Sequence, residues 1–196
     1  ERGFFKMFSW YQRTFLLKNF RAHNINMELA LTALVSLDPF KFSGGWYEVA
    51  SHKAGFSPWS AYTCLDTRSL YEYNPDTDEF DVQTQCRHLD RTVGGIKSIM
   101  RCPPLKDGNV GTTCAVRYPN APYVQPSRFK VLATDYESYA LVEGAEDKSF
   151  VQIFSRYARP GNRFIEAKAE LLRNWGYDPS WLHMTPVTIE SDQSTK

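Results

Sequence analysis

Four cysteines are the side chains whose number and order most directly predict covalent chemistry in this chain. Cys64, Cys86, Cys102 and Cys114 all lie in one stretch that has the pattern of consecutive strands. An even number of cysteines on neighbouring antiparallel strands suits disulfides, and four cysteines allow three pairings. We favour Cys64 with Cys86 and Cys102 with Cys114, which would indicate an oxidising compartment. Four reduced core thiols are one alternative. A zinc site is a weaker one, because no two cysteines have ligand spacing and His88 is the only histidine close by.

Catalytic chemistry is not predicted by any arrangement of residues. The histidines are scattered, at His23, His52, His88 and His183, and no spacing places two carboxylates as an acid and base pair. No Ser/His/Asp or Cys/His set, phosphate loop or metal motif stands out. A net charge of +1, from 23 basic and 22 acidic residues, argues against nucleic acid as the main partner. We therefore predict a non-enzymatic protein with no required cofactor and no metal.

The elements that must position these side chains are mostly strands. Eight apolar or alternating runs are separated by turn residues, at 46–52, 69–73, 80–86, 95–102, 112–118, 129–134, 139–142 and 150–155. Regularly spaced strands with short connections favour an antiparallel sandwich or an up-and-down barrel. A chain of 196 residues is long enough to bury a sizeable core, so a single fold is expected.

Helical periodicity appears on both sides of the strands. Residues 162–176 predict one helix, with Asn162 as its N-cap and Gly176 closing it. Residues 26–36 predict a short helix that Pro39 stops. A short ninth strand is an option at 187–189, before a frayed tail.

The first 22 residues differ from the rest in being both aromatic and basic. Exposed apolar surface of this kind is an association site, and rings mixed with cations suit a bilayer interface or a groove on a membrane protein. The alternative is a helix packed against the outside of the chain's own domain. No apolar run is long enough to cross a bilayer, so we expect peripheral attachment. The residues predicted to dock are Phe4, Phe5, Phe8, Trp10, Tyr11, Arg13, Phe15 and Phe20.

Three motifs favour the barrel over the sandwich. A Gly-x-Trp at the first strand, a Thr-Asp-Tyr turn late in the strand series and an Arg after the last main strand resemble the signature of lipocalins. The resemblance implies an all-β, eight-stranded antiparallel up-and-down barrel with one C-terminal helix, preceded here by a helical N-terminal extension. It also implies that Arg156 stacks over the ring of Trp46 at the barrel floor. The signature residues are Gly44, Trp46, Thr134, Asp135, Tyr136 and Arg156.

Residues 38–186 resemble, more narrowly, the plastid lipocalins of plants and algae, through Trp-Tyr-Glu-Val-Ala-Ser at 46–51, Ala-Thr-Asp-Tyr at 133–136 and Gly-Tyr-Asp-Pro at 176–179. That group tends to carry one more cysteine on the second strand and another near the C-terminus. Here Asp66 stands near the first position and the tail has none. The loss of both fits the loss of one disulfide and leaves the other four cysteines paired. We divide the chain into an N-terminal extension (1–37), a barrel with its helix (38–190) and a tail (191–196).

An eight-stranded barrel is just wide enough for one small ligand, with alternate residues facing inward. A mainly apolar pocket with a few polar groups is usual for a lipid, fatty acid or pigment. The alternative is that these side chains fill a closed barrel and bind nothing. Glu48, as a carboxylate in an apolar barrel, should be hydrogen-bonded or more easily protonated than usual. The residues predicted to face inward are Glu48, Ala50, His52, Phe129, Val131, Ala140, Val142, Gln152 and Phe154.

Two functional hypotheses follow from the resemblance together with the N-terminal composition. In the first, the protein is a carrier in the chloroplast thylakoid lumen. It binds a hydrophobic lipid or pigment and associates with the light-harvesting antenna for photoprotection. In the second, the barrel holds no ligand and the N-terminal segment docks it as a structural subunit of a photosystem–antenna supercomplex.

Overall fold

The computed structural model describes residues 34–53, 64–123, 125–144 and 150–188, and every structural statement below concerns these residues. The predicted docking residues and most of the predicted helix at 26–36 lie outside them. In chain order the elements are α2 (Pro39–Phe42), β1 (Gly44–Lys53), β2 (Leu65–Asn74), β3 (Glu79–Arg87), β4 (Val93–Arg101), β5 (Thr113–Arg117), β6 (Ser127–Thr134), β7 (Tyr139–Glu143), β8 (Phe150–Ser155), α3 (Asn162–Asn174), η1 (Pro179–Trp181) and β9 (His183–Met184).

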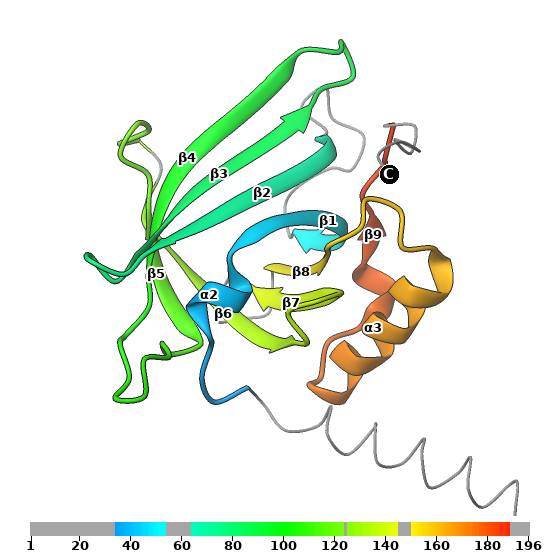
Figure 1. Ribbon diagram of the computed structural model, residues 1–196. Helices are drawn as coiled ribbons and strands as arrows, with labels where there is room; N and C mark the ends of the chain where they lie inside the picture. Colours follow the sequence, from blue (N-terminus) through cyan, green and yellow to red (C-terminus); the bar gives the residue numbers. More distant parts are fainter. Residues whose placement is uncertain (1–33, 54–63, 124, 145–149, 189–196) are drawn as a thin grey trace, which may run out of the picture. The chain divides into compact units, whose positions relative to one another are not determined.

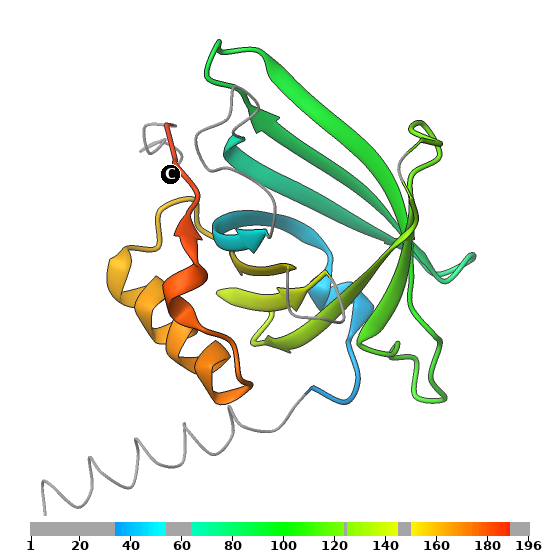
Figure 2. The same ribbon diagram turned by 180° about the vertical axis from the view of Figure 1, so that it is seen from behind.

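The strands form one antiparallel sheet that closes on itself. Each strand from β2 to β7 pairs with the next along the chain, and β1 pairs with both β8 and β2. Closure leaves no free edge between these strands, which is how barrels avoid edge-to-edge association. The predicted eight-stranded up-and-down barrel with one C-terminal helix is confirmed, and Figures 1 and 2 show α3 beside β9 on the outside of the sheet.

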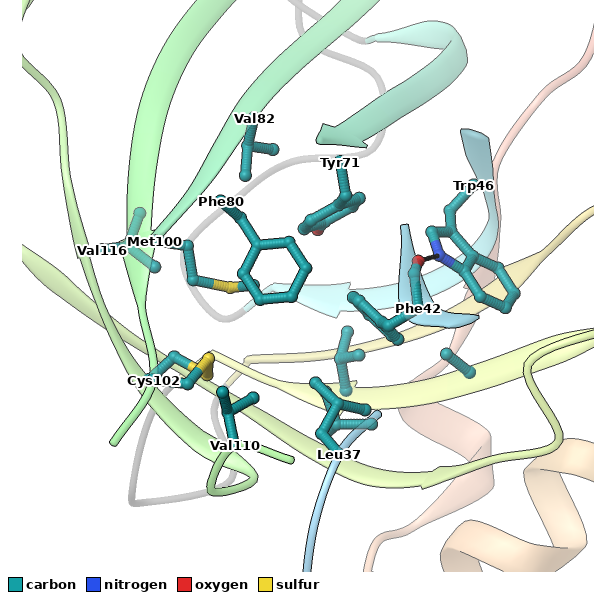
Figure 3. Packing of buried hydrophobic residues seen from close by; sticks show 14 of the residues in the cluster. Leu37, Phe42, Trp46, Tyr71, Phe80, Val82, Met100, Cys102, Val110 and Val116 are labelled. Atoms are coloured by element: carbon teal, nitrogen blue, oxygen red, sulfur yellow. Dashed lines mark hydrogen bonds between the residues drawn. A yellow bond between two sulfur atoms is a disulfide. The ribbon is translucent and has the colours of Figure 1, made fainter. Parts of the chain in front are cut away.

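Two apolar clusters lie on opposite sides of the barrel wall. The inner cluster includes Phe42, Trp46, Phe80 and Met100, and Figure 3 shows these side chains gathered inside the sheet. The outer cluster joins the strands to α3, where Leu172 is fully buried. Burial of apolar surface on both faces of the wall explains why the strands that face α3 have runs of buried residues rather than strict alternation.

The short helix α2 seals the end of the barrel at which β1 begins. Asp38 caps it by accepting hydrogen bonds from the amides of Phe40 and Lys41, both at 3.1 Å. The helix predicted at 26–36 does not include the described residues 34–36, and Pro39 begins a separate helix, at a position where a missing amide costs nothing. Phe42 then points into the barrel, where its ring packs against aromatic rings of β1, β2, β3 and β6.

The helix α3 covers the outside of the wall, and one detail of it differs from the prediction. Its N-cap is Gly161, which has no side chain to accept a capping bond, and Asn162 is the first helical residue. Gly176 follows the end of the helix with φ +79°, the left-handed conformation that glycine adopts without strain. The ninth strand is His183–Met184, and residues 187 and 188 belong to no strand.

The C-terminal strap (residues 183–188) fills a gap in the wall between β1 and β2. The pairing of these two strands stops at Tyr47, after which β1 pairs with β9 along the same edge. Further along, the amide of Thr185 donates to the carbonyl of Val49, and the amide of Asp66 donates to the carbonyl of Pro186, both at 3.0 Å. The strap therefore bridges the two strands where they have separated.

Candidate ligand site inside the barrel

Arg156 and Trp46 form the floor of the barrel. The guanidinium carbon lies 3.6 Å from the centre of the indole ring, and the indole nitrogen donates to the carbonyl of Phe42 at 2.8 Å. The guanidinium also donates to the backbone carbonyls of Gly45 and Ser43, both at 3.0 Å. Burial lowers the pKa of Arg156, with Asp135 acting against that effect, and an arginine stays charged in any case. The contact is a cation stacked on an aromatic face, in a fixed position.

The Thr-Asp-Tyr turn attaches to the same floor. Asp135 accepts hydrogen bonds from the amides of Glu137, Ser138 and Tyr139, at 2.8 to 3.1 Å. Burial raises the pKa of Asp135, but the hydrogen bonds outweigh it and hold the pKa below its ordinary value. This residue is thus fully engaged in holding the turn.

Tyr136 links the turn to the rest of the floor. It lies in the left-handed region at φ 66°, its carbonyl accepts from the Nε of Arg156 at 3.0 Å, and its hydroxyl accepts from the amide of Asp38 at 3.1 Å. Thr134 accepts from the Tyr136 amide at 2.9 Å. Gly44, at φ +100°, lies so close to the guanidinium that an added Cβ would be 3.1 Å from it. The structure therefore brings all the predicted signature residues together.

The direction of each side chain in β1 follows from its partners in β8. Directly paired residues in an antiparallel sheet point to the same face, and Phe154 belongs to the inner cluster while Ile153 belongs to the outer one. Glu48 pairs with Phe154 and so faces inward, whereas Ala50 pairs with Ile153 and so faces outward. A register shift between Glu48 and Ala50 interrupts the alternation.

Two of the predicted inward residues are therefore placed wrongly. Ala50 packs in the outer cluster, and His52 lies outside with its ring 5.2 Å from that of Trp181. Ser51 faces inward in their place, paired with Gln152. The extra residue of the bulge reverses the side of every later residue in β1, which simple alternation cannot anticipate.

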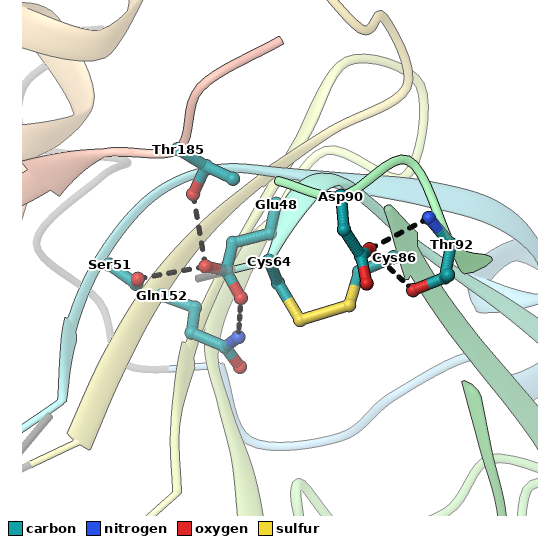
Figure 4. The surroundings of a disulfide bond; sticks show 8 residues. All are labelled: Glu48, Ser51, Cys64, Cys86, Asp90, Thr92, Gln152 and Thr185. Atoms are coloured by element: carbon teal, nitrogen blue, oxygen red, sulfur yellow. Dashed lines mark hydrogen bonds between the residues drawn. A yellow bond between two sulfur atoms is a disulfide. The ribbon is translucent and has the colours of Figure 1, made fainter. Parts of the chain in front are cut away.

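Glu48 is the buried carboxylate of the interior, with 4% of its surface exposed. It accepts hydrogen bonds from the hydroxyl of Ser51 at 2.8 Å, from the hydroxyl of Thr185 at 3.0 Å and from the side-chain amide of Gln152. Figure 4 shows these donors converging on the carboxylate from β1, β8 and the C-terminal strap. A buried charge is tolerated when donors surround it in this way.

The interior changes from apolar to polar with distance from the floor. Along β3 the inward residues are Phe80, then Val82, then Thr84, whose hydroxyl lies 2.8 Å from that of Ser69 on β2. Ser98 faces Val82 from β4 and is buried. A ligand with an apolar body and a polar end would match this sequence of side chains.

Tyr71 connects the apolar and polar parts of the interior. Burial raises the pKa of the Tyr71 hydroxyl well above the ordinary value. A hydrogen bond with Ser69 lowers this pKa, and the charge of Glu48 raises it. Tyr71 therefore remains a neutral hydroxyl within reach of the electrostatic field of the buried carboxylate.

Of the remaining predicted lining residues, Val131, Ala140, Val142 and Phe154 belong to the inner cluster and Phe129 packs against it. Sequence alternation in 69–86 could have found several more. The inward residues that were not predicted include Phe42, Ser51, Ser69, Tyr71, Phe80, Val82, Thr84, Ser98, Met100 and Val116.

Two disulfides brace the strands. Cys64, just before β2, is bonded to Cys86 on β3, and Cys102, just after β4, is bonded to Cys114 on β5. This is the pairing that the sequence analysis preferred. Within the described residues no helix has the length and apolar character that a bilayer span requires.

The barrel, its floor and its outer helix define a class of protein. A family model described as a lipocalin-like domain matches residues 37–187, and the chain belongs to the lipocalin family. Chloroplastic lipocalin of Arabidopsis thaliana is 35% identical to it over 168 residues, a match that covers 79% of this chain and 48% of that protein. The chain thus spans about half the length of this relative.

Solved structures support the same fold. Lobster apocrustacyanin A1 superposes with a TM-score of 0.56 at 18% identity, covering 75% of this chain and 78% of its own. Insecticyanin of the tobacco hornworm Manduca sexta superposes with a TM-score of 0.57 at 16% identity, covering 79% of this chain and 84% of its own. At such identities the likeness concerns the fold alone.

Proposed function

We propose that this chain is a non-enzymatic plastid lipocalin that carries one hydrophobic molecule inside its barrel. The ligand class is a lipid, fatty acid or pigment. The observation that carries the proposal is the composition of the inner face, in which an apolar floor gives way to hydroxyls and a hydrogen-bonded Glu48. An apolar body with a polar end would satisfy both parts, since unpaired polar groups are costly in such a place.

The compartment and the biological role rest on the similarity to chloroplastic lipocalin and are proposals of the same kind. We place the protein at the lumenal side of the thylakoid membrane, with a role in photoprotection of the antenna. Two disulfides support an oxidising compartment, because a reducing one would not preserve them.

Binding inside the barrel is tested by blocking it. Val82→Trp adds a large ring to the inner face, and it should weaken binding of a fluorescent polyene fatty acid about tenfold, given that overpacking costs about 1–3 kcal/mol. Gln83→Trp is the matched control, because the neighbouring residue on β3 faces outward. Circular dichroism establishes that both variants are folded. Equal affinity of the folded Val82→Trp variant and the wild type would overturn internal binding.

The identity of the natural ligand is a separate measurement. Mass spectrometry of molecules extracted from natively purified protein should detect one hydrophobic compound at close to equimolar amount. The same extraction from the Val82→Trp variant should yield much less. A compound that is equally abundant in both samples does not occupy the barrel and would count against the carrier function.

Membrane association is proposed to depend on residues 1–22, which lie outside the described residues. Their mixture of rings and cations is the observation that favours it, and also the alternative of a docked structural subunit. Deleting residues 1–22 should release the protein from washed thylakoid membranes while the barrel stays folded. Retention of the shortened protein on the membranes would contradict the proposal.

A further inference from the structure

Two cysteines and a histidine that are separate in the sequence meet at one corner of the barrel. Cys64 precedes β2, Cys86 lies near the end of β3 and His88 directly follows β3. The two sulfurs and one ring nitrogen of His88 all lie within 4.8 Å of one another. Cysteine sulfur and imidazole nitrogen are the ligand types that zinc prefers in proteins.

The ring of His88 is held in place by its surroundings. Its backbone amide donates to the carbonyl of Thr92 at 2.8 Å, and its carbonyl accepts from the amide of Arg91 at 2.9 Å. The ring lies against Gly94, where an added Cβ would be 2.5 Å from Nε2, and Gly94 pairs with Cys86 across the sheet. The glycine therefore leaves the space that the imidazole occupies beside the disulfide.

One nitrogen of this ring has no partner in the described structure. Nδ1 of His88 is buried and makes no hydrogen bond. A buried polar atom without a partner is energetically costly, so an imidazole of this kind beside two sulfurs calls for an explanation.

We propose that reduction of the Cys64–Cys86 disulfide by a dithiol creates a metal site, in which both thiolates and the imidazole of His88 bind one zinc ion. The proposal concerns the corner where the start of β2 meets the end of β3, and it does not depend on the proposed carrier function. In the oxidised protein the sulfurs are bonded to each other, so the site exists only after reduction.

The reduction has a defined course. A thiolate of the dithiol attacks the sulfur of Cys64, which is half-buried, and the bonding electron pair leaves with Cys86 as a thiolate. The second thiol of the reductant displaces Cys64 from the mixed disulfide, and the reductant leaves as its own disulfide. Zinc then binds both cysteines as thiolates, and the two thiol protons go to solvent.

The Cys64–Cys86 disulfide is more accessible to a reductant than the Cys102–Cys114 disulfide. Cys102 and Cys114 are 1% and 2% exposed in the inner cluster, so a reductant cannot reach them without opening the barrel. Among the described residues no His, Asp or Glu joins that pair in a group of three ligands. The second disulfide is therefore a control within the same chain.

The geometry requires only small movements. Zinc takes sulfur at about 2.3 Å and nitrogen at about 2.0 Å, so tetrahedral ligand atoms lie roughly 3.5 Å apart. The Cα atoms of Cys64 and Cys86 are 5.2 Å apart, and side-chain rotation moves the freed sulfurs to such a separation. Water completes the fourth position, as in other sites with three protein ligands.

Figure 4 shows Asp90, hydrogen-bonded to Thr92, in the surroundings of the same disulfide.

The test titrates zinc into the whole protein against a chromophoric chelator. The oxidised protein should bind no zinc, and protein reduced with a phosphine that is then removed should bind one equivalent. Cobalt in place of zinc should give a thiolate-to-metal absorption band in the reduced protein only. His88→Ala should weaken binding at least about tenfold, whereas the control His183→Ala, at an exposed position of β9, should not.

A second variant avoids the reductant. Cys64→His cannot form the disulfide but keeps a zinc ligand at position 64, so the oxidised variant should bind zinc with no reductant present. Circular dichroism identifies the samples that are folded. The proposal is overturned if the folded, reduced wild type binds no zinc, if His88→Ala binds as tightly as the wild type, or if folded Cys64→His binds none.

Discussion

Replacing Arg156 with Met should lower the unfolding temperature of the barrel by several degrees. The guanidinium stacks on Trp46 at 3.6 Å and donates to the carbonyls of Tyr136, Gly45 and Ser43, each at 3.0 Å. These partners come from the first strand, the segment before it and the late turn, which lie far apart in the chain. Methionine fills much of the same volume but makes none of these contacts.

The magnitude follows from the lost contacts. Each hydrogen bond is worth about 0.5–1.5 kcal/mol net and the stacked cation about 1–2 kcal/mol. Arg156 is half-buried, and water can reach part of the freed carbonyl surface, so we take the low end, about 3 kcal/mol in total. At about 2–4 °C per kcal/mol for a domain of this size, the midpoint should fall by roughly 6–12 °C. Arg156→Lys should lower the unfolding midpoint by about half as much, because lysine keeps the charge but lacks the planar guanidinium with its several donors.

Thermal unfolding followed by far-ultraviolet circular dichroism measures the effect. Arg173→Met is the matched control, because it removes the same charge from an exposed pair with Glu170 on α3. That change should cost less than about 0.5 kcal/mol. Equal midpoints for Arg156→Met and Arg173→Met would refute the reasoning, since they would mean that the floor contacts add no stability.

Three more outcomes are expected, one each for α2, the Thr-Asp-Tyr turn and the C-terminal strap. Phe42→Ala removes a fully buried ring and should cost about 3–5 kcal/mol in urea unfolding, whereas Phe40→Ala, at 64% exposed, should cost under about 1 kcal/mol. Burial raises the pKa of Asp135, but the hydrogen bonds lower this pKa by more than burial raises it. The ionised Asp135 therefore stabilises the fold above about pH 4, and this stabilisation is lost as the pH falls through the lowered pKa. Asp135→Asn should therefore show a shallower acid dependence of stability than the wild type. Asp66→Ala removes the acceptor for the amide and hydroxyl of Thr188, so hydrogen exchange should speed up in the strap and stay unchanged in β6.

The floor of the barrel could be predicted from the sequence because each of its parts is a local motif. A glycine before Trp46, a turn with Asp135 and an arginine after the last main strand each have a short-range reason for their position. The strand order then brings the three together. Four inner-cluster residues of β6, β7 and β8 were also predictable, since their period of two is visible in the sequence.

The side on which residues after a bulge point could not be predicted, because bulges depend on tertiary packing. The shift between Glu48 and Ala50 places Val49 and Ala50 together in the outer cluster, and a second shift, between Val131 and Ala133 in β6, does the same for Leu132 and Ala133. A single extra residue reverses the side of all that follow. Alternation therefore holds only as far as the first bulge.

A zinc site at Cys64, Cys86 and His88 ranked as the weakest alternative in the sequence analysis for a different reason. Zinc motifs are recognised in sequence by short spacings, and Cys64 precedes Cys86 by 22 residues. In the folded sheet the start of β2 lies beside the end of β3, so the two cysteines are close in space although they are far apart in the sequence. Ligand sets that form across strands are visible only once the register is known.

The bulge in β1 connects the carboxylate to the closure of the wall. Without it, Ser51 would face outward and could not donate to Glu48, and Ala50 would face the interior. The same region is where β1 leaves β2 and accepts the strap, whose Thr185 supplies another donor to the carboxylate. A buried carboxylate needs several donors at once, so the irregular strand and the inserted strap are both required for Glu48 to remain inside. The polar end of the interior therefore exists because the barrel departs from regular pairing at this point.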